Sequence, residues 1–315
     1  MAAYLTLKYS FQPQQNGTVE VVTTNLRNKS YPRLSTNNTS NKQVQAVLKE
    51  IEDLVGLQSV KKLLYEIQAY IEIQKKRKQE NLINEPLVLH MIFKGNPGTG
   101  KTTVARLVAK LFKELNVLKK GHVIEVERAD LVGEYIGHTA IKTREQIQRA
   151  LGGVLFIDEA YSLARGGEKD FGKEAIDCMV KAMEVYKDQL ILILAGYKRE
   201  MEWFLQTNPG LRSRFPIHID FPDYNLDELL QIADLMLEKR EYKLTCEARL
   251  ILKNIIEKKL KAGHEHHGNA RMVRNLIEKA IRLQAVRLLE KEDNLTRNDL
   301  VLITKDDLIE ASQTI

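Results

Sequence analysis

Cysteine is nearly missing from this chain, which has Cys178 and Cys246 and no others among its 315 residues. Two cysteines without metal-type spacing exclude a disulfide framework and do not suggest a zinc site, so we expect reduced thiols. Long apolar runs are missing as well, since none approaches the roughly 20 residues that span a bilayer. Residues 1–8 lack the basic and apolar regions of a signal peptide. We therefore expect a cytoplasmic protein without a membrane span.

Neither sign of charge dominates the chain. Lysine and arginine number 48 against 42 aspartate and glutamate residues, which gives a net charge of +6. The densest basic run, at residues 75–78, ends a helix-like stretch, where a solvated helix end explains it. This balance permits an anionic partner without requiring one, and nucleic acid is not the partner we expect.

The apolar pattern divides the chain into four parts. Residues 1–45 are rich in Asn, Gln, Thr and Ser and are predicted to be a polar tail or a small adaptor. Residues 46–84 show helical spacing and are predicted to be a helical linker. Residues 85–222 alternate short apolar runs with amphipathic stretches, and residues 223–315 show mainly helical spacing.

Five strands are expected within this alternating part, at residues 88–93, 122–126, 154–157, 190–195 and 217–221. Strands that alternate with helices favour a parallel sheet covered by helices on both faces. The predicted fold class is therefore α/β, with a small helical domain after it. A β-like run at 301–303 is expected inside that second domain.

Residues 95–102 match the phosphate-loop pattern G-x-x-x-x-G-K-[ST] in full, after an apolar strand and before an amphipathic helix. Glycines in such a loop permit positive φ angles and let backbone N–H groups surround an anion. Lys101 is expected to reach the β- and γ-phosphates, and the Thr102 hydroxyl to bind Mg²⁺. The predicted nucleotide contacts here are Gly95, Asn96, Pro97, Gly98, Thr99, Gly100, Lys101, Thr102 and Thr103.

Another apolar strand, expected next to the strand of the phosphate loop, ends in Asp158 and Glu159. A desolvated carboxylate is costly without a cation or another compensating contact. Asp158 is expected to bind Mg²⁺ together with Thr102, and Glu159 to polarise the attacking water. ATP and Mg²⁺ are therefore the predicted cofactors, and hydrolysis of ATP to ADP and phosphate is the predicted reaction.

These two motifs, together with the order of strands and helices, resemble the AAA+ superfamily. The segment 208–215 is similar to its arginine-finger segment, which implies that Arg214 reaches the nucleotide site of a neighbouring subunit, with Arg212 the weaker candidate. Residues 268–271 resemble the sensor-2 motif, which implies that Arg271 contacts the γ-phosphate from the helical lid. Residues 54–57, with Val55 and Gly56, resemble the segment that packs around adenine.

Within the superfamily, residues 133–140, 156–163 and 192–197 resemble the branch of the red-type Rubisco activases and stage V sporulation protein K. Residues 163–175 favour the sporulation side of that branch. The resemblance implies an AAA+ P-loop NTPase core with a five-stranded parallel sheet, a small all-helical lid, and a ring of identical subunits. It also implies a protein client, and it suggests a role in bacterial spore formation.

The loop after the second strand contains Tyr135, Ile136 and Gly137, where hexameric AAA+ remodellers carry an aromatic residue in the axial pore. An aromatic side chain offers contact area with few rotamers to fix, which suits gripping an extended peptide. Without the resemblance, a packed core position would be the expectation for Tyr135. With it, we expect a pore loop that grips the client.

The strand at 190–195 departs from the superfamily pattern. The polar sensor-1 residue that follows it is commonly Asn or Thr, whereas Gly196 and Tyr197 stand here. The hydroxyl of Tyr197 offers a substitute of different length, so the residue that positions water stays an open question.

The preferred function is protein remodelling by a sporulation-type ATPase, and a Rubisco-activase-like remodeller is the nearest alternative. Three functions of other kinds also stay open. A nucleic-acid motor or clamp-loader subunit would share the nucleotide site, but it calls for a basic pore loop where Glu134 stands. A small-molecule phosphotransferase would leave Arg214 and Arg271 without a role. A nucleotide-gated scaffold with slow turnover is suggested by Tyr197 alone.

Overall fold

The computed structural model describes residues 39–83, 88–135, 137–165, 170–261, 268–290 and 295–313. Ile136 of the predicted pore loop and most of the predicted polar tail lie outside these ranges. No helix within the described ranges has the length and apolar character needed to cross a membrane.

Two helices precede the sheet, α1 (Thr39–Glu52) and α2 (Gln58–Gln79). α1 begins inside the stretch predicted as a polar tail, because Val44, Val47 and Ile51 fall on one helical face and are buried. That face packs against α3 (Lys101–Glu114), which starts at the phosphate loop. α1 thereby belongs to the covering layer of the core.

The core contains a five-stranded sheet whose order is β2-β3-β4-β1-β5, with every pairing parallel. Its strands are β1 (Met91–Gly95), β2 (Val123–Val126), β3 (Val154–Ile157), β4 (Ile191–Gly196) and β5 (Ile217–Phe221). The predicted five-stranded parallel sheet is confirmed, but β4 separates β1 from β3, so the two motif-bearing strands are not neighbours as expected. The chain order of strands does not determine their spatial order, and β4 brings Gly196 and Tyr197 between the two motifs.

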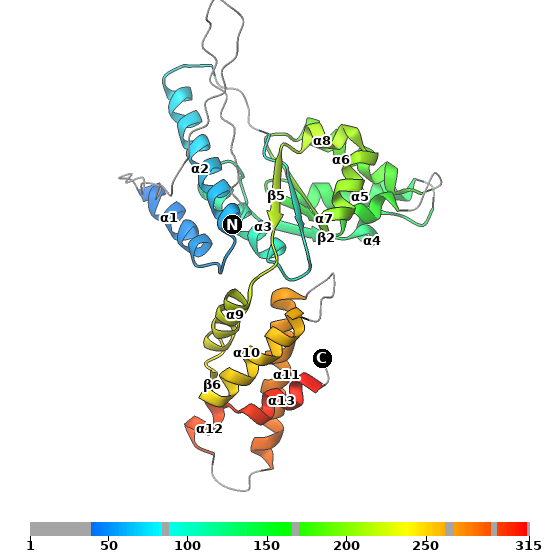
Figure 1. Cartoon of the computed structure of the whole chain (residues 1–315). Helices are drawn as coiled ribbons and strands as arrows, with labels where there is room; N and C mark the ends of the chain where they lie inside the picture. The colour runs from blue at the N-terminus through cyan, green and yellow to red at the C-terminus, as the bar shows by residue number, and fades with distance from the viewer. Residues whose placement is uncertain are drawn as a thin grey trace, which may run out of the picture.

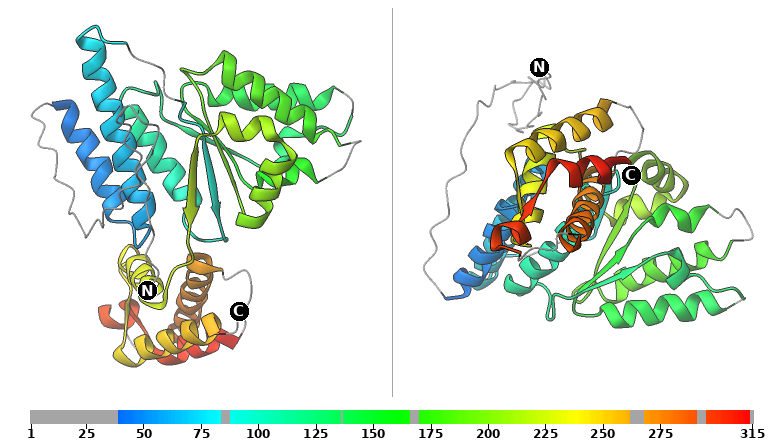
Figure 2. Two further views of the ribbon diagram at one scale, coloured as in Figure 1. Left: turned by 45° about the horizontal axis from the view of Figure 1, so that its top comes forward. Right: turned by 90° about the horizontal axis from the view of Figure 1, so that it is seen from below.

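Helices cover both faces of this sheet, with α1, α2 and α3 on one side and the green helices on the other (Figures 1 and 2). Alternate strand residues supply the two cores, as Phe93 belongs to one buried cluster and its neighbour Ile92 to the other. The second face is covered by α4 (Arg128–Leu131), α5 (His138–Ala150), the 3-10 helix η1 (Ala160–Ala164), α6 (Gly172–Val185), α7 (Lys198–Thr207) and α8 (Pro209–Arg214).

The lid follows β5 and lies below the sheet in Figure 1. Its elements are α9 (Leu226–Glu238), β6 (Lys243–Leu244), α10 (Cys246–Lys261), α11 (Asn269–Leu289), α12 (Arg297–Val301), β7 (Leu302–Ile303) and α13 (Lys305–Gln313). A capping box fixes the start of α9, since Asn225 Oδ1 accepts from Glu228 N at 2.9 Å and Glu228 Oε2 accepts from Asn225 N at 2.8 Å. The predicted β-like run becomes β7, which pairs in parallel with β6 within an otherwise helical domain.

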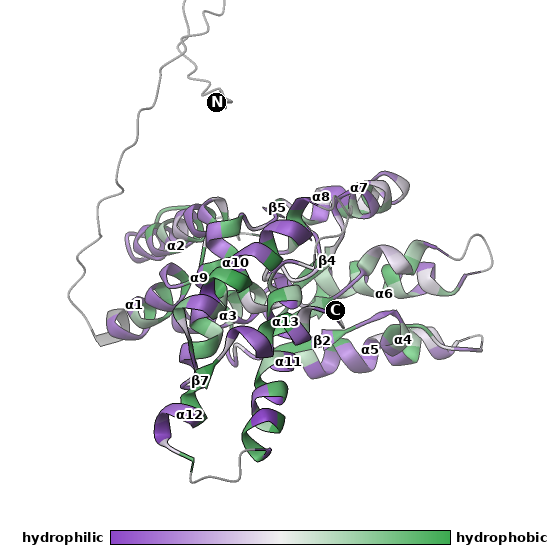
Figure 3. Cartoon of the chain, turned by 60° about the horizontal axis from the view of Figure 1, so that its bottom comes forward, coloured by the Kyte–Doolittle hydropathy of each residue, from purple (hydrophilic) through white to green (hydrophobic). Residues whose placement is uncertain are grey.

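The lid helices each carry hydrophobic and hydrophilic residues, shown green and purple in Figure 3, as expected for helices with one buried face. A buried ion pair joins two of these helices. Arg287 Nε of α11 donates to Asp307 Oδ1 of α13 at 2.9 Å, and Thr304 N donates to Asp307 Oδ2 at 2.8 Å. Asp307 is therefore a buried carboxylate whose charge is paired and hydrogen-bonded, and its pairing with Arg287 joins α13 to α11.

Candidate active site

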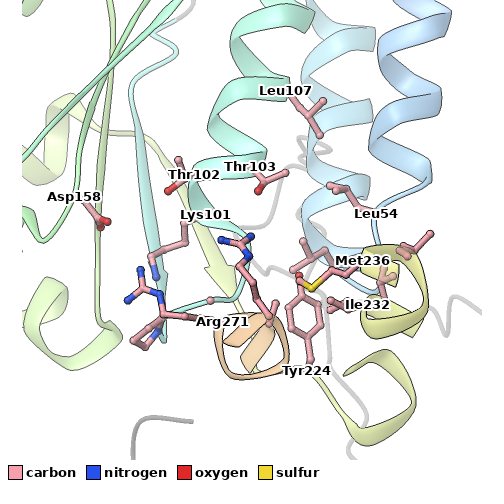
Figure 4. A pocket seen from close by; sticks show the side chains of 18 of the residues that line it. Leu54, Lys101, Thr102, Thr103, Leu107, Asp158, Tyr224, Ile232, Met236 and Arg271 are labelled. Carbon is pink, nitrogen blue, oxygen red and sulfur yellow. The ribbon is translucent and has the colours of Figure 1, made fainter. Parts of the chain in front are cut away.

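A cavity of about 820 Å³ lies between the carboxyl edge of the sheet, the turn after α1 and the lid. Figure 4 shows that its two ends differ in chemistry. The apolar end is lined by Leu54, Leu107, Tyr224, Ile232 and Met236. The polar end is lined by Lys101, Thr102, Asp158, Glu159 and Arg271. A nucleotide fits this arrangement, with its flat base at the apolar end and its phosphates at the polar end.

The phosphate loop has the backbone that its glycines predict. Gly98 has a φ angle of 73° and Gly100 one of 96°, both in the left-handed region that glycine adopts readily. Lys101 Nζ donates to the carbonyl oxygens of Gly95 and Asn96, each at 2.8 Å. Burial lowers the pKa of Lys101, and the nearby Asp158 opposes that shift. A partly desolvated ammonium held at this loop gains from the arrival of an anion.

Two carboxylates follow β3 as the sequence predicts. Asp158 N donates to Val126 O at 3.0 Å, which continues the β2–β3 ladder to the strand end, and Asp158 Oδ1 accepts from Glu159 N at 3.0 Å. Glu159 has a φ angle of 47°, in the left-handed region that is uncommon for non-glycine residues.

The donor set fits Mg²⁺. Among the described residues, no group of three His, Cys, Asp or Glu side chains is placed to hold a metal by itself. Mg²⁺ is usually held by one or two carboxylates, with phosphate oxygens and water completing its shell. Asp158 and Thr102 line the same wall and match that requirement.

The lid contacts the phosphate loop directly. A Cβ atom at Gly98 would lie 2.4 Å from Gly268 O and 2.8 Å from Arg271 N, so only glycine permits this approach. Ala270 N donates to Gly98 O at 3.2 Å. The predicted sensor-2 residue Arg271 thus lies on the wall beside the phosphate loop.

A hydrogen-bonded junction that the sequence analysis did not identify joins the loop, the end of β5 and α11. Asn269 is 1% exposed, and its Nδ2 donates to Asp223 Oδ1 at 2.8 Å and to Pro97 O at 3.3 Å. Its Oδ1 accepts from Tyr224 N at 3.0 Å. Asp223 also accepts from Asn96 Nδ2 at 2.9 Å. Asp223 and Tyr224, which follow shortly after β5, were the sequence features from which this junction could have been predicted.

The predicted adenine-side segment forms the turn between α1 and α2. Gly56 and Leu57 have φ angles of 62° and 55°. A Cβ atom at Gly56 would lie 2.4 Å from Glu228 Oε1 of the lid. Lys61 Nζ holds the turn by donating to Glu52 O at 2.8 Å and Leu54 O at 2.6 Å. This turn places Leu54 and Val55 on the cavity wall.

The structure brings most predicted nucleotide contacts to one wall. Those on the wall are Val55, Pro97, Gly98, Gly100, Lys101, Thr102, Thr103 and Arg271, together with Asp158 and Glu159. Gly56, Gly95, Asn96 and Thr99 are not part of the wall. The carbonyl oxygens of Gly95 and Asn96 accept from Lys101 Nζ, and Thr99 Oγ1 donates to Asn96 O. Tyr197 at the sensor-1 position is on the wall.

The predicted arginine finger and the predicted pore tyrosine also lie apart from the cavity wall. Arg214 Nη2 pairs with Glu184 Oε1 at 2.7 Å, and Arg214 Nη1 donates to Gly210 O at 3.0 Å. Tyr135 is 66% exposed, so the core position that its residue type alone favoured is wrong. Its ring lies 5.5 Å from the ring of His138, at the start of α5.

Residues 91–223 match the family of ATPases associated with various cellular activities (AAA), and residues 225–315 match the AAA lid domain. The chain is 57% identical over 273 residues to the stage V sporulation protein K of Bacillus subtilis, across 85% of this chain and 84% of that protein. It is 44% identical over 272 residues to the chloroplastic ribulose bisphosphate carboxylase/oxygenase activase of Cyanidioschyzon merolae, across 85% and 92%. The crystal structure of the FIGL-1 AAA domain in complex with ADP has a TM-score of 0.57 at 18% identity, covers 90% of this chain and 92% of that one, and shows a likeness of fold alone.

Fold and site together define a P-loop ATPase with a helical lid. The chain belongs to the AAA ATPase family, in the branch of stage V sporulation protein K and the Rubisco activases. The predicted family, its branch and its ATPase activity are thereby confirmed, and a nucleotide is the ligand that this family binds.

Proposed function

We propose that the chain hydrolyses Mg²⁺–ATP at the junctions of a homo-oligomeric ring and uses the energy to remodel a protein client. The observation that carries this proposal is that the predicted catalytic residues of one subunit do not all lie at its own cavity. Lys101, Thr102, Asp158 and Glu159 share one cavity wall, whereas Arg214 lies outside that wall. A neighbouring subunit's arginine would complete the site, in the way that trans-acting arginines stabilise transition-state charge.

Each residue in the cavity has a separate part in the reaction. Adenine packs against the apolar end, and the phosphates meet the loop N–H groups, Lys101 and the N-terminus of α3. Mg²⁺ held by Thr102 and Asp158 would neutralise charge that develops on the phosphate oxygens. Glu159 polarises the attacking water, and Arg271 contacts the γ-phosphate from the lid. Loss of the γ-phosphate releases Arg271 and changes the lid angle.

The lid contacts give a physical route from hydrolysis to movement. Gly98 packs against the start of α11, and Asn269 bonds to both the loop and Asp223. A shift of the loop after phosphate release therefore moves α11 as well. In a ring, the same shift would displace the pore loop around Tyr135 and Gly137 and pull on a bound polypeptide.

The protein client follows from the pore loop and from the relatives. The exposed Tyr135, which lies between α4 and α5, offers contact area that suits an extended polypeptide, and Ile136 is the proposed third member of that loop. One relative is named as a sporulation protein and another as an activase of a carboxylase. We assign the spore-forming role to this chain on the higher identity, 57% against 44%.

The first test is assembly, measured by mass photometry with and without Mg²⁺–ATP. We expect ring-sized particles in ATP that are lost in Lys101→Met. A protein that stays monomeric in saturating ATP contradicts the ring.

Client contact is tested with a permanently unfolded protein, carboxymethylated α-lactalbumin. It should bind wild type and Tyr135→Phe in ATP, and Tyr135→Ala should lose about tenfold in affinity while retaining ATPase activity. Turnover stimulated by double-stranded DNA and not by the polypeptide would favour a nucleic-acid motor instead.

A further inference from the structure

An arginine that does not line the nucleotide cavity joins three segments on one side of the sheet. Arg128 is the first residue of α4, and its Nη2 donates to Asp170 Oδ1 at 2.6 Å. The same oxygen accepts from Gly172 N at 2.9 Å, at the start of α6. Arg128 Nη1 donates to Ser162 O of η1 at 2.6 Å. The guanidinium fork thus holds α4, η1 and the start of α6 together.

We call Arg128, Ser162, Asp170 and Gly172 the Arg128 junction. Its packing requires glycine at the start of α6, because a Cβ atom at Gly172 would overlap Leu163 O and lie 3.1 Å from Arg128 Nη1. The Asp170 side chain is only 5% exposed. A buried carboxylate paired with a hydrogen-bonded arginine is costly to break, so the junction resists separation of the three segments.

On one side, the junction connects to the carboxylate that is proposed to polarise water. Ser162 N donates to Glu159 O at 2.8 Å, and Ser162 O accepts from Arg128. The φ and ψ angles of Glu159 are 47° and 42°, a left-handed backbone that persists at a non-glycine residue only where the surrounding structure determines it. A change in this backbone with the state of the nucleotide would therefore reach Arg128 through Ser162.

On the other side, the junction connects to the loop of Tyr135. The helices α4, α5 and α6 lie together on the same side of the sheet (Figure 1). At the end of α4, Leu131 O accepts from Thr143 Oγ1 at 3.0 Å, and two residues later Gly133 N donates to Thr139 Oγ1 at 2.9 Å. These buried bonds attach the start of the loop to α4 and α5. A displacement of α4 therefore displaces Tyr135 as well.

We propose that Arg128 is a positioning residue that couples the state of the nucleotide to the grip of Tyr135 on the client. Through Ser162, it holds α4 at a position that depends on the backbone of Glu159. This inference rests on the proposed function. It adds a route from the hydrolysis site to the client that does not pass through the lid.

The test compares ATP turnover with and without a client. The stimulation factor is kcat for ATP with saturating carboxymethylated α-lactalbumin, divided by kcat without it. In wild-type rings we expect a factor of about five, and in Arg128→Met a factor below about two, because the contact with Ser162 O is lost. The Kd of the polypeptide in ATP should stay within about threefold, since Tyr135 is still present, and so should kcat without polypeptide.

Arg287→Met is the matched control. Arg287 is 33% exposed and pairs with Asp307, which is 2% exposed, and Arg128 is likewise 34% exposed beside its buried carboxylate. Both variants should therefore lose a similar amount of stability. Because Arg287 joins α11 to α13, away from η1 and α4, Arg287→Met should keep the stimulation factor of wild type.

The outcomes separate this inference from the proposed function. Wild-type stimulation in assembled Arg128→Met rings overturns the role of Arg128 alone. Equal losses of stimulation in Arg128→Met and Arg287→Met also overturn it, because they indicate general damage. A wild-type protein whose turnover the polypeptide does not change contradicts the proposed function, and this inference with it.

A double variant keeps the test decisive if Arg128→Met does not assemble. Arg128→Met leaves the charge of Asp170 buried without its arginine, which is strongly destabilising. Adding Asp170→Asn removes that charge and keeps an acceptor for Gly172 N. Rings of the double variant should bind the polypeptide without stimulated turnover, and full stimulation in them would overturn the role of Arg128.

Discussion

Arg214 and Glu184 form a surface ion pair, with 2.7 Å between Nη2 and Oε1, and the pair lies off the wall that holds Lys101. Exposed pairs of this kind contribute less than about 1 kcal/mol to the free energy of unfolding. The ion pair therefore gives Arg214 little part in stability, and the role that we propose for this arginine is catalysis in a neighbouring subunit.

The pair gives the first prediction. Arg214→Ala should lower ATP turnover about 10³-fold, as for other trans-acting arginines. Glu184→Ala removes the same ion pair but keeps the Arg214 side chain, so ATP turnover should change less than about fivefold. The Tm should be nearly unchanged in both variants. Equal losses of turnover in the two variants would mean that Arg214 serves only the pair.

Lys101 gives the second prediction. Because burial lowers its pKa, the folded chain bears a cost for holding this ammonium without an anion. Lys101→Met should therefore keep or raise the Tm of the nucleotide-free protein. It should lose the ATP-induced rise in Tm, which at 100 times Kd corresponds to about 2.7 kcal/mol. A full ATP-induced rise in Lys101→Met would contradict the assignment.

The junction at Asn269 gives the third prediction. Asn269→Ala leaves Tyr224 N–H and one Asp223 contact unsatisfied, which costs about 1–3 kcal/mol in the free energy of unfolding. Asn269 also has a φ angle of 44°, so Asn269→Gly serves as the control that relieves the backbone. Both variants should reduce the dependence of lid position on nucleotide, measured by fluorescence transfer between labels on α3 and α10. Wild-type transfer changes in both variants would show that the junction does not couple lid and loop.

The fourth prediction is that His90 makes the free energy of unfolding depend on pH. It is 4% exposed, its Nδ1 accepts from Leu192 N at 3.0 Å, and burial lowers the pKa of His90 to about 4. The folded state thus disfavours the charged form, so this stability is present above pH 6.5 and is lost as the pH falls toward 4. The full loss is about 3 kcal/mol.

Urea unfolding at pH 7.5 and pH 5 measures that effect. His90→Asn offers an acceptor that does not titrate, so its stability should fall less between these two pH values than that of wild type. Identical pH slopes in the two proteins would exclude His90 as the group responsible.

The sequence predicted the parts of the site that depend on local patterns. The phosphate loop, Asp158 and Glu159 follow from strand ends and residue spacing. Tyr224 and Thr99 are bonded across 125 positions, and Asn269 and Pro97 across 172, so no local pattern reveals those contacts. The same reason applies to the strand order, in which β4 separates the two motifs.

Trans-complementation tests the central claim most directly. Glu159→Gln rings keep Arg214 but not the water-polarising carboxylate, and Arg214→Ala rings keep the carboxylate but not the finger, so each alone should be nearly inactive. In mixed rings, a site with Glu159 meets an Arg214 from its neighbour, and the account predicts that ATPase activity rises well above that of either variant. Mixed rings, confirmed by mass photometry, that show no more activity than the separate variants would contradict hydrolysis between subunits.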